Sequence, residues 1–299
     1  MPEKIGFVGL GIMGRPMALN LSKAGYEVHA FDIFPEAIKR VTDADARVKA
    51  AASCADAARK GDIIITMVQD GPQARQAITG KDGVLDGAAR GKLIVDMSSI
   101  APSVSQEIGK ACAAKGVGFL DGPVSGGEPG AINAALAIMV GGNASDFERA
   151  KPVFDKLGKS SVLCGQVGAG QVVKLANQIV VGLNILAVAE ALVLAQKAGV
   201  NPETVFEAIK GGLAGSTVMN AKAPMMFNRN FQPGFRIELH YKDINNAMQA
   251  AREMQVPLQA TANLQQILTS LVLSGDGKLD HSGILHFVEK QAGVEVRKK

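Results

Sequence analysis

The first half of the chain alternates short apolar runs with segments of helical spacing, and the second half does not. Runs rich in Val, Ile and Phe recur up to residue 165, and most of them end in Gly, Asp or Ser. Such alternation predicts a mainly parallel, doubly wound α/β sheet of the Rossmann type. The predicted strands are KIGFVGL (4–10), YEVHAFD (26–32), DIIITMV (62–68), KLIVDMS (92–98), GFLDGPV (118–124) and LAIMVGG (136–142), and the predicted helices include Met13–Ala24, Pro35–Thr42, Gln73–Ile78 and Val104–Lys115.

The pattern changes after SSVLCG at residues 160–165, beyond which only helical stretches and turn sequences follow. This change predicts a dinucleotide-binding domain over residues 1–164 and an all-helical substrate and oligomerisation domain over residues 165–299. A long apolar stretch, Gly168–Gly199, predicts one helix that joins them. With 299 residues, of which 47% are hydrophobic, the chain is long enough for two cores.

Composition excludes several classes of partner. The net charge of +4 is scattered and the chain has no Trp, so we expect no nucleic-acid binding. Cys54, Cys112 and Cys164 lie far apart without a Cys-x-x-Cys motif, which indicates reduced thiols and no metal site. The first predicted strand leaves no room for a signal peptide, and the uncharged stretch Leu175–Ala189 is shorter than the roughly 20 residues that span a bilayer. We therefore expect a cytoplasmic protein that does not bind membranes.

A glycine motif follows the first predicted strand directly. Gly9-Leu10-Gly11-Ile12-Met13-Gly14 is a G-x-G-x-x-G that opens a helix, as in dinucleotide-binding folds. Such glycines permit a tight turn and a close approach of backbone to a pyrophosphate, and the helix N-terminus offers N–H groups to the anion. The hexapeptide alone is a weak signal.

Asp32 strengthens this signal, because it ends the second predicted strand 23 residues after Gly9, where a carboxylate can bind the ribose 2′-hydroxyl. The alternative is a glycine-rich turn with Asp32 as a helix cap before Pro35. The carboxylate would repel a 2′-phosphate, and Ile33 and Phe34 follow it in place of an Arg. We therefore predict NAD as the cofactor, with NADP possible.

Lys174 stands near the start of the long apolar helix. It shares a helix face with Asn177 and Gln178. Burial of an ammonium is costly and lowers its pKa, so such a lysine requires a reason. Reduction of a carbonyl creates an alkoxide that must be protonated, and we expect Lys174 to supply that proton from the cleft between the domains. The alternative is a lysine that snorkels, with its charge in water.

Two polar turns follow other predicted strands. Ser125-Gly126-Gly127 offers successive backbone N–H groups, which suit a carboxylate, although the segment could be a simple turn. Ser98 and Ser99 lie where the chain leaves the edge of the sheet that lines a nucleotide crevice. Ser99 or Ser103 could equally cap the following helix.

Together these stretches resemble the β-hydroxyacid dehydrogenase family. FVGLGIMGRPM, DMSSIAP, DGPVSGGEPGA, GAGQVVKLANQ, GGLAGSTV and GFRIELHYKD occur in order over nearly the whole chain. An ordered set of this kind is far more specific than any single motif.

The resemblance implies a role for each matching position in the substrate site. Lys174 would be the catalytic acid/base, and Asn177 would help to hold the substrate. Ser125, Gly126 and Gly127 would bind the substrate carboxylate.

The resemblance also implies contacts with the cofactor. Lys242 would lie near it, steadied by Asp243, and Ser99 would lie by the nicotinamide ribose. The loop at Met67, Val68 and Gln69 would cover the cofactor. The family commonly has a Leu-Pro pair where Val68-Gln69 stands here, so we expect the backbone of this loop to matter more than its side chains.

The activity that the resemblance implies is a reversible, NADH-linked reduction of a small carboxylate-bearing aldehyde, in a homo-oligomer, dimer or tetramer. We expect tartronate semialdehyde (2-hydroxy-3-oxopropanoate) as the substrate and D-glycerate as the product. Alternatives are 3-hydroxyisobutyrate, 4-hydroxybutyrate or a threonate-like acid. A nucleotide-binding module without catalysis and a decarboxylating dehydrogenase of the phosphogluconate type are more distant alternatives.

Overall fold

The computed structural model describes residues 3–298 and divides into two compact units, one up to Lys174 and one from Leu175 onwards. The first unit is a sheet with helices on both faces and the second is helical, so the predicted fold class is confirmed. The long helix α9 (Ala169–Lys197) is also present and runs across the division. The domain boundary predicted at residue 165 lies at the end of the last strand, before α9, and stays a prediction.

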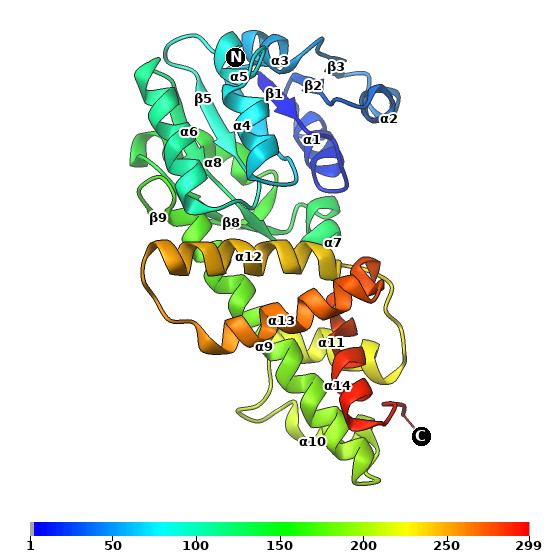
Figure 1. Cartoon of the computed structure of the whole chain (residues 1–299). Coiled ribbons are helices and arrows are strands. Elements are labelled where there is room, and N and C mark those ends of the chain that lie inside the picture. Colours follow the sequence, from blue (N-terminus) through cyan, green and yellow to red (C-terminus); the bar gives the residue numbers. More distant parts are fainter. Residues whose placement is uncertain (1–2, 299) are drawn as a thin grey trace. The chain divides into compact units, whose positions relative to one another are not determined.

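Nine strands of the first unit form one sheet in the order β3-β2-β1-β4-β5-β6-β8-β7, with β9 paired to β8 (Figure 1). β1 to β6 pair in parallel, whereas β8 is antiparallel to β6 and β7. The strand order changes direction between β1 and β4, which is where a doubly wound sheet binds nucleotides. The strands are β1 (Ile5–Val8), β2 (Val28–Phe31), β3 (Val48–Ala50), β4 (Ile63–Thr66), β5 (Leu93–Asp96), β6 (Gly118–Asp121), β7 (Val124–Ser125), β8 (Leu136–Gly141) and β9 (Gly158–Gly165).

Both faces of this sheet are covered, because successive side chains of a strand point to opposite sides. In β4, Ile63 and Ile65 join a core cluster with residues of α1, α2 and α8, whereas Ile64 joins a cluster with residues of α3 to α6. Burial on both faces explains why the strands read as continuous apolar runs. The helices are α1 (Gly14–Lys23), α2 (Pro35–Ala44), α3 (Cys54–Lys60), α4 (Gly71–Thr79), α5 (Val84–Gly87), α6 (Pro102–Ala114), α7 (Gly127–Ile132) and α8 (Ala144–Phe154).

The four helices named from the sequence are all present, but other elements were not predicted. Helix α3 buries only alanines, Ala55, Ala57 and Ala58, so its apolar periodicity is weak. Strand β3 has one buried residue, Val48, followed by two exposed ones. Small side chains and short length therefore hid these elements from an argument based on hydrophobic spacing.

The amino edge of the sheet is held by a lysine. Lys92, directly before β5, donates through Nζ to the carbonyl oxygens of Ala58, Arg59 and Gly61 at 2.7 Å each. These carbonyls lie at the C-terminus of α3, where a cation interacts favourably with the helix dipole. Burial lowers the pKa of Lys92. This edge of the sheet is therefore fixed by bonds within the protein.

The second unit is helical, as predicted, and no strand is assigned beyond Gly165 in the described residues. α12 and α13 lie side by side in Figure 1, and their buried faces join the C-terminal part of α9 in one core. Members of this core include Ile185, Leu192, Phe227, Ile244 and Leu268. The helices are α10 (Pro202–Ile209), α11 (Thr217–Phe227), α12 (Ile237–Glu253), α13 (Gln259–Leu273) and α14 (Ile284–Ala292), with short 3-10 turns at Asp276–Lys278 and His281–Gly283.

Helix α9 is long and apolar enough to cross a membrane by length and composition alone. The uncharged stretch within it, Leu175–Ala189, is shorter and led to the prediction of a buried helix. Half of the most apolar window of α9 is buried inside the protein, and core helices of soluble proteins pass the same test. Its burial is consistent with a core helix.

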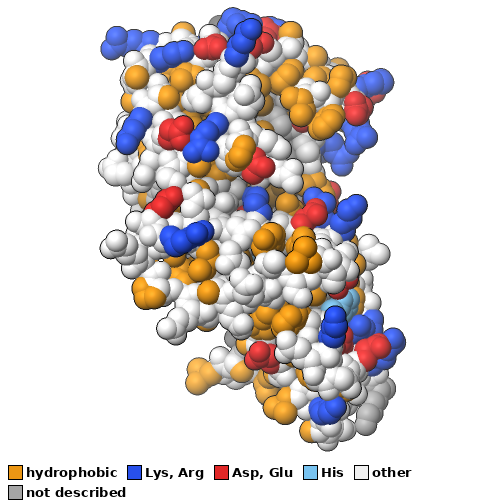
Figure 2. All heavy atoms as spheres, viewed as in Figure 1, with side chains coloured by type: hydrophobic (Ala, Val, Ile, Leu, Met, Phe, Trp, Pro, Cys, Tyr) orange, Lys and Arg blue, Asp and Glu red, His pale blue; other side chains and the backbone are white. Residues whose placement is uncertain are grey.

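The surface charges are mixed. Figure 2 shows Lys and Arg interspersed with Asp and Glu over the visible face, and its basic side chains do not gather into one patch there.

The three cysteines are free thiols, and burial raises the pKa of Cys112 to about 12.

Candidate active site

The glycine loop after β1 is shaped by close backbone contacts. Gly9 has a φ of +94°, and a Cβ there would lie 2.2 Å from the carbonyl oxygen of Met67. A Cβ on Gly14 would lie 1.9 Å from the carbonyl oxygen of Gly9. Both positions therefore require glycine, and the loops after β1 and β4 touch at the point where the strand order changes direction.

Gly11 differs from its neighbours, because a Cβ there would meet no protein atom within 4 Å. Within residues 3–298, the backbone amides of Gly11, Ile12 and Met13 donate no hydrogen bond, and Met13 at the N-cap of α1 offers no side-chain cap. Open space beside unpaired amides at a helix N-terminus is what a pyrophosphate requires. The residues predicted to hold the cofactor phosphates therefore fit that group.

Asp32 lies at the end of β2 beside the glycine loop. Its Oδ2 accepts a hydrogen bond from the Leu10 amide at 2.6 Å, and its Oδ1 accepts one from the Phe34 amide at 2.9 Å. Phe34, not Asp32, occupies the N-cap of α2. The Asp32 carboxylate therefore does not cap this helix, and one of its oxygens binds the glycine loop. Ile33 and Phe34 are exposed beside it.

The loops after β4 and β5 are joined by a buried polar network. The Val68 amide donates to Ser98 Oγ at 2.9 Å, and Ser98 Oγ donates to Asp96 Oδ1 at 2.7 Å. Thr66 Oγ1 donates to the same oxygen at 2.8 Å. Thr66, Asp96 and Ser98 have no exposed surface, so this network fixes the backbone of the loop at residues 67–69.

Ser99 lies in the loop between Ser98 and Ile100, next to this network. The N-cap of the following helix α6 is Ala101, so neither Ser99 nor Ser103 occupies it. Asp96 was not among the predicted site residues. Its position at the end of a buried strand is the signal that could have revealed it, because a buried acid there needs donors.

The first turn of α9 is bound to the carboxyl edge of the same sheet. Asp121, the last residue of β6, accepts hydrogen bonds from the amides of Gly168 at 2.6 Å and Gln171 at 2.9 Å. The Gln171 side chain donates to the carbonyl oxygen of Ser98 at 2.8 Å and accepts from the Ile100 amide at 3.1 Å. Both side chains are fully buried, and neither was predicted from the sequence.

Lys174 follows Gln171 by three residues, so the two share a face of α9. It is 5% exposed, which leaves little of its side chain to water and disfavours the snorkelling alternative. Lys174 lies one turn after the turn of α9 whose amides bind Asp121.

Ser125, Gly126 and Gly127 form the predicted turn between β7 and α7. Ser125 ends β7, and the two glycines adopt φ values of +136° and +61°. Asn20 of α1 donates to the carbonyl oxygen of Ala131 in α7 at 2.8 Å. Helix α7, which follows the turn, is thereby bound to α1, the helix after the glycine loop.

In the second unit, a separate polar group connects α9 with α12. Asn177 donates to Gln178 Oε1 at 2.8 Å, and Gln178 donates to Asp243 Oδ2 at 2.7 Å. Lys242 Nζ lies 3.2 Å from Asp243 Oδ1, so the expected pairing of these two residues is present. His240, which was not predicted, hydrogen-bonds the carbonyl oxygen of Gln178 at 3.1 Å.

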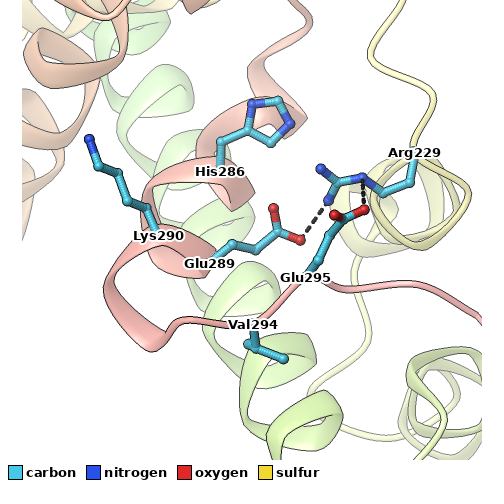
Figure 3. Close-up of a pocket in the computed structure, with 6 residues that line it drawn as sticks. All are labelled: Arg229, His286, Glu289, Lys290, Val294 and Glu295. Carbon is cyan, nitrogen blue, oxygen red and sulfur yellow. Dashed lines mark hydrogen bonds and ion pairs between the residues drawn. The ribbon is translucent and has the colours of Figure 1, made fainter.

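A cavity of about 320 Å³ lies elsewhere in the second unit (Figure 3). Arg229 points across it toward Glu289 and Glu295. Its guanidinium lies 2.5 Å from Glu289 Oε1, which also accepts the Val296 amide at 2.6 Å. Arg229 is thus paired with carboxylates of the protein, and Glu289 also binds the C-terminal segment through the Val296 amide.

Comparison with known proteins covers nearly the whole chain. Residues 4–168 match the family model described as the NAD binding domain of 6-phosphogluconate dehydrogenase, and residues 168–288 match the NAD-binding model of NADP-dependent 3-hydroxyisobutyrate dehydrogenase. The 2-hydroxy-3-oxopropionate reductase of Escherichia coli is 43% identical, with 97% of this chain and 98% of the relative covered. This chain belongs to the β-hydroxyacid dehydrogenase family.

Two further relatives of this β-hydroxyacid dehydrogenase support the family assignment. The 2-(hydroxymethyl)glutarate dehydrogenase of Eubacterium barkeri is 39% identical, with 98% of this chain and 97% of the relative covered. A structure of 3-hydroxyisobutyrate dehydrogenase from Mycobacterium tuberculosis with L-serine has a TM-score of 0.89 and 33% identity, and covers 96% of this chain and 99% of that one.

The family assignment settles the enzyme class. The protein is an NAD(P)-dependent oxidoreductase of the hydroxyacid type, which confirms the predicted class and cofactor. The helical unit matches the 3-hydroxyisobutyrate dehydrogenase model, which argues against the phosphogluconate alternative.

Proposed function

We propose that this enzyme reduces 2-hydroxy-3-oxopropanoate (tartronate semialdehyde) to D-glycerate with NADH, reversibly. The observation that carries the substrate is the 43% identity to the Escherichia coli 2-hydroxy-3-oxopropionate reductase over 97% of this chain. The reaction turns the aldehyde group of a three-carbon hydroxyacid into a primary alcohol, and we assign it to glyoxylate metabolism.

Lys174 is the proposed general acid. Bound nicotinamide supplies the hydride in this chemistry, and Lys174 gives a proton to the alkoxide as it forms. Ser125, Gly126 and Gly127 would hold the substrate carboxylate through backbone amides and one hydroxyl, and Asn177 would hold the reacting end. In oxidation Lys174 must be neutral to accept the proton, so oxidation is faster at alkaline pH.

The proposed cofactor contacts follow the geometry of the first unit. The glycine loop from Gly9 to Gly14 would bind the pyrophosphate, and Asp32 would bind the adenosine ribose. The backbone of residues 67–69 and Ser99 would flank the nicotinamide end, and Lys242 is proposed to lie near it. Support comes from the unpaired amides of the glycine loop and from the rigid network beneath residues 67–69.

A preference for NADH over NADPH rests on Asp32. Asp32→Asn retains an oxygen for the Leu10 amide but removes the charge that repels a 2′-phosphate. Measured kcat/KM for NADPH relative to NADH should rise by about tenfold, which corresponds to about 1.4 kcal/mol. An unchanged ratio would refute the role of this carboxylate.

A second candidate substrate is favoured by the 39% identity to a 2-(hydroxymethyl)glutarate dehydrogenase. The 3-hydroxyisobutyrate type shares this fold closely. Steady-state kinetics of the oxidation of D-glycerate, 3-hydroxyisobutyrate, 4-hydroxybutyrate, threonate and 2-(hydroxymethyl)glutarate, and of the reduction of 2-hydroxy-3-oxopropanoate, each with both cofactors, would decide. A higher kcat/KM for an acid other than D-glycerate in the oxidative direction would displace the proposed substrate.

The role of Lys174 is tested by Lys174→Ala, with Lys197→Ala at the other end of α9 as the matched control. Loss of a general acid should lower kcat by about 10²- to 10⁴-fold while NADH binding, followed by its fluorescence, is retained. Lys197→Ala should behave as the wild type. Near wild-type turnover of Lys174→Ala would show that the proton comes from elsewhere.

We also propose a cytoplasmic homo-oligomer, a dimer or tetramer. Val180, Ala187 and Leu194 leave an apolar stripe of α9 exposed at helical spacing, and Val180 and Leu194 are 58% and 72% exposed. Multi-angle light scattering of the wild type and of Val180→Glu would test this. A wild-type monomer at micromolar concentration would contradict it.

A further inference from the structure

The first turn of α9 is built into the carboxyl edge of the sheet by buried side chains. Gly168, which precedes the helix, has no side chain to cap it, and Asp121 of β6 binds the amides of Gly168 and Gln171 in its place. A Cβ on Gly170 would lie 2.4 Å from the carbonyl oxygen of Met139. The turn therefore packs directly on the strands, with no room for a change of register.

Gln171 joins this turn to the loop after β5. Its two side-chain atoms bind the backbone on both sides of Ser99, at the Ser98 carbonyl and the Ile100 amide. Ser98 in turn binds the Val68 amide and Asp96. One continuous chain of hydrogen bonds thus runs from the start of α9 to the loops after β5 and β4.

We propose that Asp121 and Gln171 are positioning residues that fix Lys174 relative to the loops proposed to flank the nicotinamide. This inference rests on the proposed role of Lys174. Lys174 lies three residues after Gln171 on the same helix face, so a shift of the first turn displaces its ammonium. A displacement of about 1 Å from the productive geometry can cost about 10²-fold in rate.

A purely structural role would lower the amount of folded enzyme without altering the chemistry of each folded molecule. Lys92→Met provides the matched control, because it removes three hydrogen bonds, two of them part-buried, at the amino edge next to strand β5. It should lower stability and leave kcat per NADH-binding site unchanged.

The test is a double-mutant cycle of Gln171→Met and Lys174→Ala, with kcat normalised to the number of NADH-binding sites. We expect Gln171→Met to lower kcat by about 10- to 100-fold in the wild type, but by less than about twofold in Lys174→Ala, because the group it positions is gone. Gln171→Glu keeps the acceptor for the Ile100 amide, but it places a buried carboxylate oxygen against the Ser98 carbonyl, so its loss should be at least as large. Asp121→Asn, which keeps one acceptor oxygen, should lose less than Asp121→Ala.

Equal losses in the two backgrounds, or a loss below about threefold in the wild type, would overturn the positioning role. If Gln171→Met does not fold, the same cycle with Asp121→Asn carries the test. Near wild-type turnover of Lys174→Ala alone would instead overturn the proposed function, so the two failures are distinguishable.

Discussion

The two edges of the sheet in the first unit both hydrogen-bond charged side chains, but these side chains have different partners. At the amino edge, Lys92 binds three carbonyls at the C-terminus of α3. At the carboxyl edge, Asp96 and Asp121 bind hydroxyls and amides of loops and of the first turn of α9. Burial moves both kinds of group toward neutrality, since it lowers the pKa of Lys92 and raises the pKa of Asp121 to about 6.

The two networks differ in whether backbone amides near them are left without a hydrogen-bond partner. The ammonium of Lys92 donates all three of these hydrogen bonds to carbonyl groups of the protein. The carboxyl-edge network instead lies under loops near Gly11, Ile12 and Met13, whose amides donate no hydrogen bond within residues 3–298. One edge therefore secures the fold, and the other holds groups in place for a ligand.

Substitution of one glycine near each edge should give the largest difference between the edges in NADH affinity and stability. Gly11→Ala adds a methyl group where no protein atom lies within 4 Å, so stability should be unchanged while NADH affinity falls by about tenfold or more. Gly61→Ala at the amino edge would bring a Cβ within 2.3 Å of the Gly6 nitrogen and should lose about 1–3 kcal/mol of stability. Fluorescence titration and urea unfolding of both variants test this, and a Gly11→Ala protein that binds NADH normally would contradict it.

A pair of fully buried serines offers a smaller contrast. Ser98→Ala removes the acceptor of the Val68 amide and a donor to Asp96, so the free energy of unfolding should fall by about 1–3 kcal/mol, and NADH should bind more weakly. Ser105 in α6 is equally buried, but its Oγ has no hydrogen-bond partner in the described chain. Ser105→Ala should therefore gain about 0.5 kcal/mol. Equal losses for the two variants would show that burial alone, and not the network, matters.

The smallest effect is a pH dependence from Asp121. Burial raises its pKa from 3.8 to about 6, and the neighbouring Asp96 carboxylate adds to the rise, while the amides of Gly168 and Gln171 oppose it. Between these values the folded state binds more protons than the unfolded state, so the stability contributed by this group is full below pH 3.8 and is lost as the pH rises through about 6.

Asp121→Asn does not titrate and supplies the reference for this effect. The stability of the wild type relative to Asp121→Asn should fall between about pH 4 and about pH 6 in urea unfolding and level off above about pH 7. Asp96 and Cys164 lie close enough to interact electrostatically with Asp121 and are present in both proteins. A difference that stays constant or grows with pH would contradict the buried, raised pKa.

Much of the fold was predictable, because strands buried on both faces and the G-x-G-x-x-G turn leave short-range patterns in the sequence. Asp32 and the glycine loop are such a case, since a fixed spacing connects them. The same reasoning missed α3, whose buried residues are alanines. In short elements with small side chains, the buried and exposed positions differ too little in hydrophobicity to give a recognisable period.

The site was only half predictable for a different reason. Lys174 could be proposed as a site residue because a charge in an apolar helix conflicts with its surroundings, and the structure shows that it is buried. Asp121 and Gln171 could not, because their partners lie 47 to 73 residues away in the sequence, and no local pattern connects a strand end with a helix start so distant. Such pairs become visible only when the sheet brings its carboxyl ends together.

The most direct test of the account is chemical rescue of Lys174→Ala by a small primary amine. If Lys174 is the proton donor at the edge of the sheet, methylamine should restore part of the lost kcat in proportion to its concentration as the methylammonium ion, without changing NADH affinity. Lys197→Ala should show no response to the amine. Near wild-type turnover of Lys174→Ala in the absence of amine would contradict the account.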